Sequence, residues 1–369
     1  MRIIFVSYIH FPDCRVGSRR ASFWHKHACT FGIESTLITT TAEARDIANV
    51  RVLPNPFVSF FTSIRVDPSI AWGVKLRGLF KTIDVKSYDF VVLTGSPFLY
   101  FNVGSYLHRM GVRVVLDFRD PFLGNPHHND SVLKRLVKEW LERKWLKSSA
   151  AALVVNEACK TIMLQNHQAP PPIAVIENGF DSELITGPEK PPSPIGGGPC
   201  VILYAGSFII PHRDPGVVVN ALKGTNCKLN HLGRLPESLS CLQADPHFES
   251  MGVFSGEIVV RATRKADICL VLTGGHEFES TTKIYEYIGL NKLVLIVTNG
   301  EKQTGALNSL TRSYPNVFWS CNNEQEIRET ITRMRRHQVE SFDSFTFSRS
   351  RSYSMLVEFL SNLKSTLDN

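Results

Sequence analysis

Short apolar runs alternate with helical stretches along most of this 369-residue chain. The first half contains FVVLTG (90–95) and AALVVN (151–156), each followed by residues with helical spacing. The second half repeats the pattern with VILYAGSF (201–208) and ICLVLTG (268–274). Strands that recur at such short spacing through intervening helices form right-handed βαβ units and a buried parallel sheet. The pattern therefore predicts an α/β protein.

One segment, from Leu184 to Pro199, breaks this alternation. Its sequence EKPPSPIGGGP is rich in proline and glycine and lacks apolar periodicity, which is typical of an interdomain linker. A chain of 369 residues is also too long for a single hydrophobic core. We therefore expect two Rossmann-like, doubly wound domains, at 1–183 and 200–345, that face each other across a cleft.

The net charge of +7 favours an anionic partner such as a nucleotide phosphate, an acidic lipid surface or a nucleic acid. Nucleic acid is not expected, because the positive charge is spread along the chain and no recognised binding module is present. The eight cysteines show no CxxC or zinc-like spacing, which favours reduced thiols in a cytoplasmic protein. No apolar run approaches the length of a membrane span, and the N-terminus lacks the features of a signal peptide.

Residues 276–297, HEFESTTKIYEYIGLNKLVLIV, pass from a hydroxyl-rich loop through a predicted helix into an apolar strand. Ser280, Thr281 and Thr282 lie where the helix begins, and Lys283 and Glu286 follow them. Free N–H groups and the helix dipole favour an anion at such a place. Ser and Thr are also common N-caps, and the hydroxyls alone favour that simpler interpretation. Together with Lys283 and Glu286 they favour a site for a phosphate and a sugar hydroxyl pair.

This segment resembles the donor-site helix of GT-B glycosyltransferases, especially the retaining, family 4-like enzymes of bacterial glycan assembly. Further segments resemble that family in the same order along the chain: FPDCRVGSRRASFW, TGSPF, LDFRDPF, IENGFD and LYAGSFIIPHRDP. The resemblance implies a GT-B fold. It also implies transfer of a sugar, with retention, from a nucleotide diphosphate sugar to a hydroxyl of a lipid-linked or surface-glycan acceptor.

The resemblance further implies that a final helix within 346–369 crosses back to the N-terminal domain. Five apolar residues at three- and four-residue spacing would form its buried face: Met355, Leu356, Phe359, Leu360 and Leu363.

Carried over position by position, the resemblance assigns a donor site. The diphosphate would be bound by Gly206, Ser207, Arg213, Ser280, Thr281, Thr282 and Lys283, and the ribose by Glu286. Glu277 and Glu279 lie where the family has its first donor-sugar carboxylate. The family places seven residues between its two glutamates, whereas six separate Glu279 from Glu286 and eight separate Glu277 from Glu286. The identity of the sugar-contacting acid therefore stays open.

Gly17, Ser18 and Arg19 open the first predicted helix, where Gly17 would allow close approach of the backbone to the donor. A plain capped helix explains these residues equally well. Asp120 follows a predicted strand in DFRDP and is expected to contact the acceptor, although an ion pair with Arg119 would also explain it.

The chain has no Asp-x-Asp motif, so the usual carboxylate pair that binds a metal and a nucleotide is missing. Arg213, Lys283 and helix N-termini would instead meet the diphosphate charge, with no metal or other cofactor. His127 and His128 are interpreted as loop residues. The candidate catalytic residues are Asp120, Glu279, Lys283 and Arg213.

Two segments bear on the acceptor. Residues 54–81 are apolar and basic without clean periodicity, and are interpreted as a loop that contacts a membrane or a lipid acceptor. The other segment, 133–147, carries six Lys/Arg and two Glu; packing of its apolar face on the domain core and binding to an anionic membrane are equally consistent with it. The apolar face of 133–147 comprises Leu133, Leu136, Val137, Trp140, Leu141 and Trp145. With membrane binding, the protein would be cytoplasmic and peripheral on the inner face of the cell membrane.

Two alternatives remain. A nucleotide-sugar 2-epimerase shares the GT-B architecture, but it would need carboxylates and a histidine around the sugar and no acceptor segment, so 54–81 argues against it. A non-catalytic protein that binds a nucleotide sugar is the other. Turnover of the donor distinguishes it from an enzyme.

Overall fold

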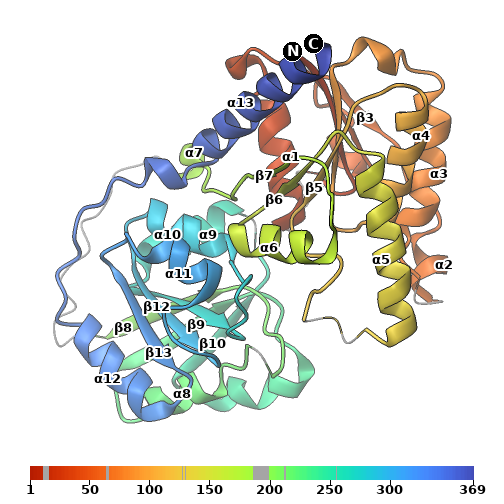
Figure 1. Cartoon of the computed structure of the whole chain (residues 1–369). Helices are drawn as coiled ribbons and strands as arrows, with labels where there is room; N and C mark the ends of the chain where they lie inside the picture. Colours follow the sequence, from red (N-terminus) through yellow and green to blue (C-terminus); the bar gives the residue numbers. More distant parts are fainter. Residues whose placement is uncertain are drawn as a thin grey trace. The chain divides into compact units, whose positions relative to one another are not determined.

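The computed structural model contains two compact units (Figure 1). The first comprises Met1–Glu177 and Ser352–Asn369, and the second comprises Asn178–Arg351. Most of the expected linker, 184–199, lies outside the described residues. The structure describes the chain except for 11–15, 64–65, 127, 129, 186–198, 212 and 255, and except for the side chains of 16 and 17.

The first unit is built on a parallel sheet with the strand order β3-β2-β1-β4-β5-β6-β7. Strand β1 lies between β2 and β4, so successive strands are added first on one side of it and then on the other. Most strand residues are apolar, as expected for a sheet buried on both faces. The strands are β1 (Arg2–Ser7), β2 (Glu34–Thr39), β3 (Val50–Val52), β4 (Phe90–Thr94), β5 (Val114–Phe118), β6 (Ala151–Val154) and β7 (Ile173–Val175).

Helices pack on both faces of this sheet. On one face, Trp24 of α1 joins Phe5 of β1 in a single apolar core. On the other, Gly104 of α4 lies against Val114 and Leu116 of β5. The helices of the unit are α1 (Val16–Lys26), α2 (Val58–Ser63), α3 (Ser69–Phe80), α4 (Asn102–Arg109), α5 (Val132–Lys147), α6 (Glu157–Asn166) and α13 (Arg349–Asp368).

The C-terminal helix α13 belongs to the first unit from Ser352 onward. Leu356, Leu360 and Leu363 are buried in the same core as α1. The ring of Tyr353 also enters this core and stacks on Trp24, with the ring centroids 6.3 Å apart. Met355, expected on the buried face, is instead 36% exposed, because the buried stripe runs through 353, 356, 360 and 363.

The second unit is built on a parallel sheet with the order β10-β9-β8-β11-β12-β13. Alternate residues of β8 point into two separate cores, with Ile202 on one face and Leu203 on the other. The strands are β8 (Cys200–Ala205), β9 (Cys227–Leu232), β10 (Phe248–Gly252), β11 (Ile268–Thr273), β12 (Leu293–Thr298) and β13 (Val317–Cys321). The helices are α7 (Ser182–Ile185), α8 (Gly216–Leu222), α9 (Gly256–Lys265), α10 (Thr282–Gly289), α11 (Gly305–Thr311) and α12 (Glu324–Met334).

These two sheets confirm the predicted α/β fold, but the prediction of a loop at 54–81 was wrong. The expected loop at 54–81 contains α2 and α3, and α3 buries Trp72, Leu76 and Phe80 in the first unit. Glycines and weak periodicity concealed this helix. Part of the segment therefore belongs to the core. Its exposed apolar residues lie in and beside both helices, at Phe57, Val58, Phe60, Val66, Ile70 and Val74.

Candidate functional site

The carboxyl ends of β8 and β11 are neighbours in the second sheet, at the point where its winding changes direction. From β8 the sheet continues through β9 on one side, and from β11 it continues through β12 on the other. The connections after β8 and β11 therefore diverge, and open α/β sheets bind their ligands in the crevice that results. Most of the expected donor-site residues lie in these two connections, 206–215 and 274–281.

Glu279 is buried in the loop after β11 and holds that loop in shape. Its Oε2 accepts hydrogen bonds from the Thr273 hydroxyl, from Gly275 N at 3.1 Å and from His276 N at 3.4 Å. Its Oε1 lies 3.8 Å from Nη2 of Arg213, in the loop after β8. The structure thus brings together two expected site residues and places a negative charge beside the expected diphosphate-binding cation.

Helix α10 starts at the same edge of the sheet. Thr281 is its N-cap, with an extended backbone and a side chain that accepts from Lys283 N at 3.4 Å, so the capping interpretation holds for this hydroxyl. The Nζ of Lys283 donates to Oε2 of Glu286 at 3.1 Å. Both side chains of this pair are largely buried, at 14% and 7% exposed. Ser280 and Thr282, on either side of the cap, are half-buried.

Gly206 is held closely at the end of β8. His231 Nε2 lies 2.9 Å from the Gly206 carbonyl oxygen, and a Cβ on Gly233 would lie only 2.2 Å from the same oxygen. Glycine at 233 is therefore required by the close approach of the two backbones. Burial lowers the pKa of the His231 imidazole below its usual value, although the bond to Gly206 acts in the opposite direction. Ser207, the next residue, is exposed.

Glu277 differs from Glu279 in its environment. Its side chain is exposed, and its carbonyl oxygen accepts from Ala306 N at 2.6 Å at the start of α11. A Cβ at Gly305 would lie 2.6 Å from that oxygen, and Gly305 has a φ of +67°. The backbone of Glu277 is thus fixed, while its carboxylate points to solvent.

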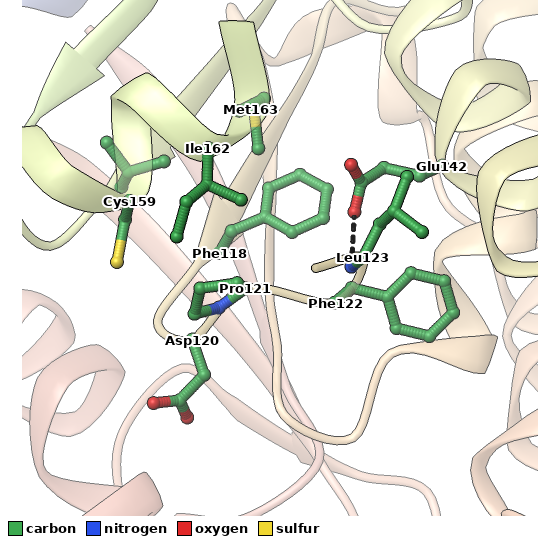
Figure 2. Close-up of a pocket in the computed structure, with 10 residues that line it drawn as sticks. Phe118, Asp120, Pro121, Phe122, Leu123, Glu142, Cys159, Ile162 and Met163 are labelled. Atoms are coloured by element: carbon green, nitrogen blue, oxygen red, sulfur yellow. Dashed lines mark hydrogen bonds between the residues drawn. The ribbon is translucent and has the colours of Figure 1, made fainter. Parts of the chain in front are cut away.

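Asp120 lies just after β5 in the first unit, with an exposed carboxylate that points away from the apolar side chains around it (Figure 2). Arg119 donates to the carbonyl oxygens of Gly95 and Ser96. On the other side of Asp120, Leu123 N donates to the buried Glu142 at 3.1 Å. Hydrogen bonds of Arg119 and Leu123 therefore fix the backbone on both sides of Asp120.

The small cavity behind Asp120 is lined mainly by apolar side chains, among them Phe118, Phe122, Ile162 and Met163 (Figure 2). Its volume is about 10 Å³, roughly the space of one water molecule. The cavity is therefore too small to receive a sugar, and a substrate can reach the Asp120 carboxylate only from its exposed side.

The overall fold of the chain is similar to that of several solved structures. Sucrose-phosphate synthase from Thermosynechococcus elongatus matches with a TM-score of 0.72 at 12% identity, covering 99% of each chain. HepE from Anabaena, solved in complex with UDP and glucose, matches with a TM-score of 0.69 at 15% identity, covering 98% of this chain and 100% of that one. UDP-GlcNAc 2-epimerase from Neisseria meningitidis, bound to UDP-GlcNAc, matches at 0.58 and 12%, with the same coverage as HepE. At these identities the matches establish the GT-B fold.

Sequence comparison adds the family. Residues 24–184 match the family described as Glycosyltransferase Family 4. Residues 24–184, which are most of the first unit and less than half of the chain, therefore resemble a glycosyltransferase family 4 domain. Among curated protein sequences, none matches this chain.

The first unit contains a buried ion pair that the sequence patterns did not reveal. Arg20 of α1 donates to Asp117 of β5 at 3.1 Å and to the Glu177 carbonyl oxygen at 3.0 Å. Burial raises the pKa of the Asp117 carboxyl, although Arg20 and Arg119 counteract this. Both residues occur in the segments that resemble the family, but only the fold brings them together. Gly17 lies one turn before Arg20, inside α1.

His127 and His128 were expected to be ordinary loop residues. His128 Nδ1 lies 3.0 Å from Nζ of Lys138, which also pairs with Asp130. His127 lies outside the described residues. In the described part of the chain, no group of three or more His, Cys, Asp or Glu side chains could hold a metal ion. Transfer without a metal or other cofactor stays a prediction.

Proposed function

We propose that this glycosyltransferase moves a sugar, with retention, from a nucleotide diphosphate sugar to a hydroxyl of a lipid-linked or surface-glycan acceptor. The proposal rests mainly on the ion pair between Arg213 and Glu279 and on the Lys283–Glu286 pair. Both pairs lie at the sheet edge where the connections after β8 and β11 diverge. Cations and carboxylates at one sheet edge suit a ligand that combines a diphosphate with sugar hydroxyls. The presence of UDP and glucose in HepE supports the same donor class.

In the proposed complex, the Lys283 ammonium and the N-terminal N–H groups of α10 bind the diphosphate, and Arg213 binds it from the loop after β8. Glu286, already paired with Lys283, accepts hydrogen bonds from the ribose hydroxyls. Gly206 leaves room for the diphosphate beside the backbone, and the exposed Ser207, with the hydroxyls of Ser280 and Thr282, completes the site. Glu277 or Glu279 contacts the donor sugar.

Catalysis then depends on charge stabilisation. As the bond to the anomeric carbon breaks, negative charge grows on the diphosphate, and Arg213 and Lys283 stabilise it. A front-face retaining reaction needs no protein base, since the departing phosphate can accept the acceptor's proton. Asp120, exposed and held by its fixed neighbours, positions the acceptor hydroxyl.

Incubation of the full-length protein with a panel of nucleotide diphosphate sugars, with and without lipid-linked acceptor, tests the proposal. Release of nucleotide diphosphate that requires the acceptor supports it. A sugar epimerised at C2 identifies the 2-epimerase alternative instead. Donor binding without either product supports a non-catalytic protein.

We also propose a membrane partner, which helix α5 would contact. Over most of this helix, charged side chains are buried and apolar side chains are exposed. Its buried residues include Lys138 and Glu142, whereas Leu133, Leu136 and Trp140 are 72%, 56% and 61% exposed. The buried charges have partners: Lys138 pairs with Asp130, and Glu142 binds His167 at 2.8 Å. Because these partners lie on the inner side, the apolar side of the helix faces outward. In Figure 1, α5 runs along the outside of the first unit.

We assign this outward face to an anionic lipid surface. Val132 and Val137 extend the exposed stripe, and Arg135 and Lys147 are exposed on the same helix. Lys144 lies 5.1 Å from the centre of the Trp140 ring. Apolar and aromatic residues beside cations suit the interface of an anionic bilayer. Phe57, just before helix α2, and Val58 and Phe60 within it are also exposed in the same unit, and we propose that they bind the lipid surface as well.

No helix in the described ranges is long and apolar enough to span a bilayer. The proposed contact is a peripheral one, made by the exposed face of α5. It would hold the enzyme at the inner face of the cell membrane, where a lipid-linked acceptor is available.

A further inference from the structure

Two cysteines of the second unit lie side by side, away from the proposed donor site. Cys200 is the first residue of β8 and Cys227 is the first residue of β9, and the two are direct partners in the parallel register. Directly paired residues on adjacent strands point to the same face of a sheet. Both side chains accordingly enter the same core, with Ile202 and Leu229 as the next residues on that face.

The spacing of the strands is compatible with a covalent bond between the two sulfurs. Neighbouring strands lie about 4.7–4.9 Å apart, inside the roughly 4.4–6.8 Å range of Cα separations in disulfides. Each thiol shifts the pKa of the other, as expected for two sulfurs that face each other across paired strands. A disulfide therefore requires rotation of two side chains and little movement of the backbone.

The two thiols also differ in reactivity. The hydrogen bond from Cys200 lowers the pKa of Cys227 to about 6, against the effect of burial and with help from Thr225, Arg335 and His247. The same hydrogen bond, with burial, raises the pKa of Cys200. By contrast, burial alone dominates at Cys269 and raises its pKa to about 12. A thiolate beside a thiol is the arrangement of an attacking and a resolving cysteine.

We propose that Cys200 and Cys227 form an oxidisable dithiol site, which a small peroxide converts to a reversible disulfide. The Cys227 thiolate attacks one oxygen of hydrogen peroxide, the O–O bond breaks, and hydroxide leaves and is protonated to water. The resulting sulfenic acid is attacked by the Cys200 sulfur, which loses its proton as the S–S bond forms and a second water leaves. Two thiols are oxidised and one peroxide is reduced to two waters.

Access to the site is through the amino-terminal edge of the sheet. Both sulfurs are almost fully buried, but the residues next to them in sequence, Pro199 and Asn226, are exposed. A peroxide is small enough to enter when this edge opens locally. The bond would join the first residues of two strands whose other ends carry Gly206 and Gly233, and would thereby stabilise the second unit against unfolding.

The experiment uses the full-length, fully reduced protein with the exposed Cys29 and Cys241 replaced by serine. After exposure to hydrogen peroxide, peptide mass spectrometry should find a linked Cys200–Cys227 pair that is lighter by two hydrogens, and the thermal unfolding midpoint should rise. Dithiothreitol should reverse both changes. Cys269→Ser, a buried control, should retain the link.

Cys200→Ser should lose the link and leave a sulfenic acid on Cys227 that dimedone traps. A protein in which Cys227 stays a thiol under peroxide would overturn the proposal. So would a folded protein in which Cys227 is oxidised beyond sulfenic acid while Cys200 remains reduced. Because the readout is covalent, it is independent of the proposed transferase activity.

Discussion

Nη2 of Arg213 lies 3.8 Å from Oε1 of Glu279, so the loops after β8 and β11 are joined by opposite charges. The family resemblance gave these residues separate tasks, diphosphate binding for Arg213 and a possible sugar contact for Glu279. Their proximity links the tasks, since an anion that reaches Arg213 also approaches Glu279. The site must therefore balance attraction and repulsion, and Lys283 supplies the additional positive charge.

Replacing Lys283 with alanine should weaken binding of nucleoside diphosphates. The lost interaction is a hydrogen bond to a charged group, which is worth about 1–3 kcal/mol. Isothermal titration calorimetry with a panel of nucleoside diphosphates measures the change. Lys228→Ala is the matched control, because Lys228 forms a surface ion pair with Glu249 at 2.7 Å in the same unit. Equal affinity of the Lys283→Ala and control proteins would remove Lys283 from the site.

Glu279→Ala and Glu277→Ala should have different effects on stability. Loss of the buried Glu279 carboxylate removes the acceptor of the His276 N–H and of the Thr273 hydroxyl, and one of the two acceptors of the Gly275 N–H, which should cost about 1–3 kcal/mol. Glu277 has an exposed side chain, so its replacement should change the free energy of unfolding by less than about 0.5 kcal/mol. Urea unfolding provides both values.

The same pair identifies the sugar contact. If Glu277→Ala loses donor turnover at full stability, Glu277 contacts the sugar and Glu279 maintains the loop. If Glu277→Ala retains turnover, the contact belongs to Glu279.

Replacing Leu136 and Trp140 of α5 with glutamate should reduce binding to anionic vesicles by about tenfold or more. Each substitution removes an apolar side chain whose burial in the lipid would contribute roughly 1.5–3 kcal/mol to binding, and it adds a negative charge that the anionic lipid repels. Vesicle sedimentation at low and high salt provides the measurement, since salt should weaken the wild-type interaction. Val253→Glu, at another exposed apolar position, is the control. Wild-type protein that binds neutral and anionic vesicles equally would contradict the proposed surface.

Leu356→Ala on α13 should destabilise the protein by about 2–5 kcal/mol, the usual range for a large side chain removed from a core. The adjacent Met355→Ala provides a matched control, because Met355 is 36% exposed and its loss should change stability by less than about 0.5 kcal/mol. Denaturant midpoints of the two variants test whether α13 closes the first core. Similar midpoints would mean that it does not.

Asp89 should make the docking of α13 sensitive to acid. Burial raises the pKa of its carboxyl, but bonds from Lys364 at 2.6 Å and from Arg2 N at 2.7 Å outweigh burial and lower it overall. A lowered pKa contributes stability above the unfolded value of about 3.9, and this contribution is lost as pH falls through the folded value. Lys364 is 39% exposed, so the effect should stay below about 1 kcal/mol.

Asp89→Asn provides the comparison. Its stability deficit in urea unfolding should be present near neutral pH and shrink as the solution is acidified below about pH 4. A deficit that is constant over this range would show that the charge of Asp89 plays no part.

Continuous apolar runs such as 90–95 and 268–274 were predicted correctly as strands, because buried parallel strands leave that pattern in sequence. Strand β10 was missed because FESMG contains few apolar residues. The dipeptide Ser96-Pro97 is typical of a helix start, yet α4 begins only at Asn102, and Arg119, distant in sequence, binds the backbone at Ser96.

Periodicity showed that Leu133, Leu136 and Trp140 share one face of α5, but it could not show which way that face points. The direction depends on Asp130 and His167, which bind Lys138 and Glu142 only in the folded chain. The Arg213–Glu279 contact was hidden for the same reason. Residue types at the candidate site were thus predictable, and their pairings were not.

Helix α13 also has a consequence for the order of folding. The core of the first unit begins with β1 and is completed by Tyr353 and the leucines of α13, whereas the second unit is continuous in sequence. During synthesis, the apolar surface beneath α13 must wait for the whole intervening segment to emerge from the ribosome. The unit that starts the chain is therefore completed after the one inserted into it, and during that interval it exposes a surface that chaperones can recognise.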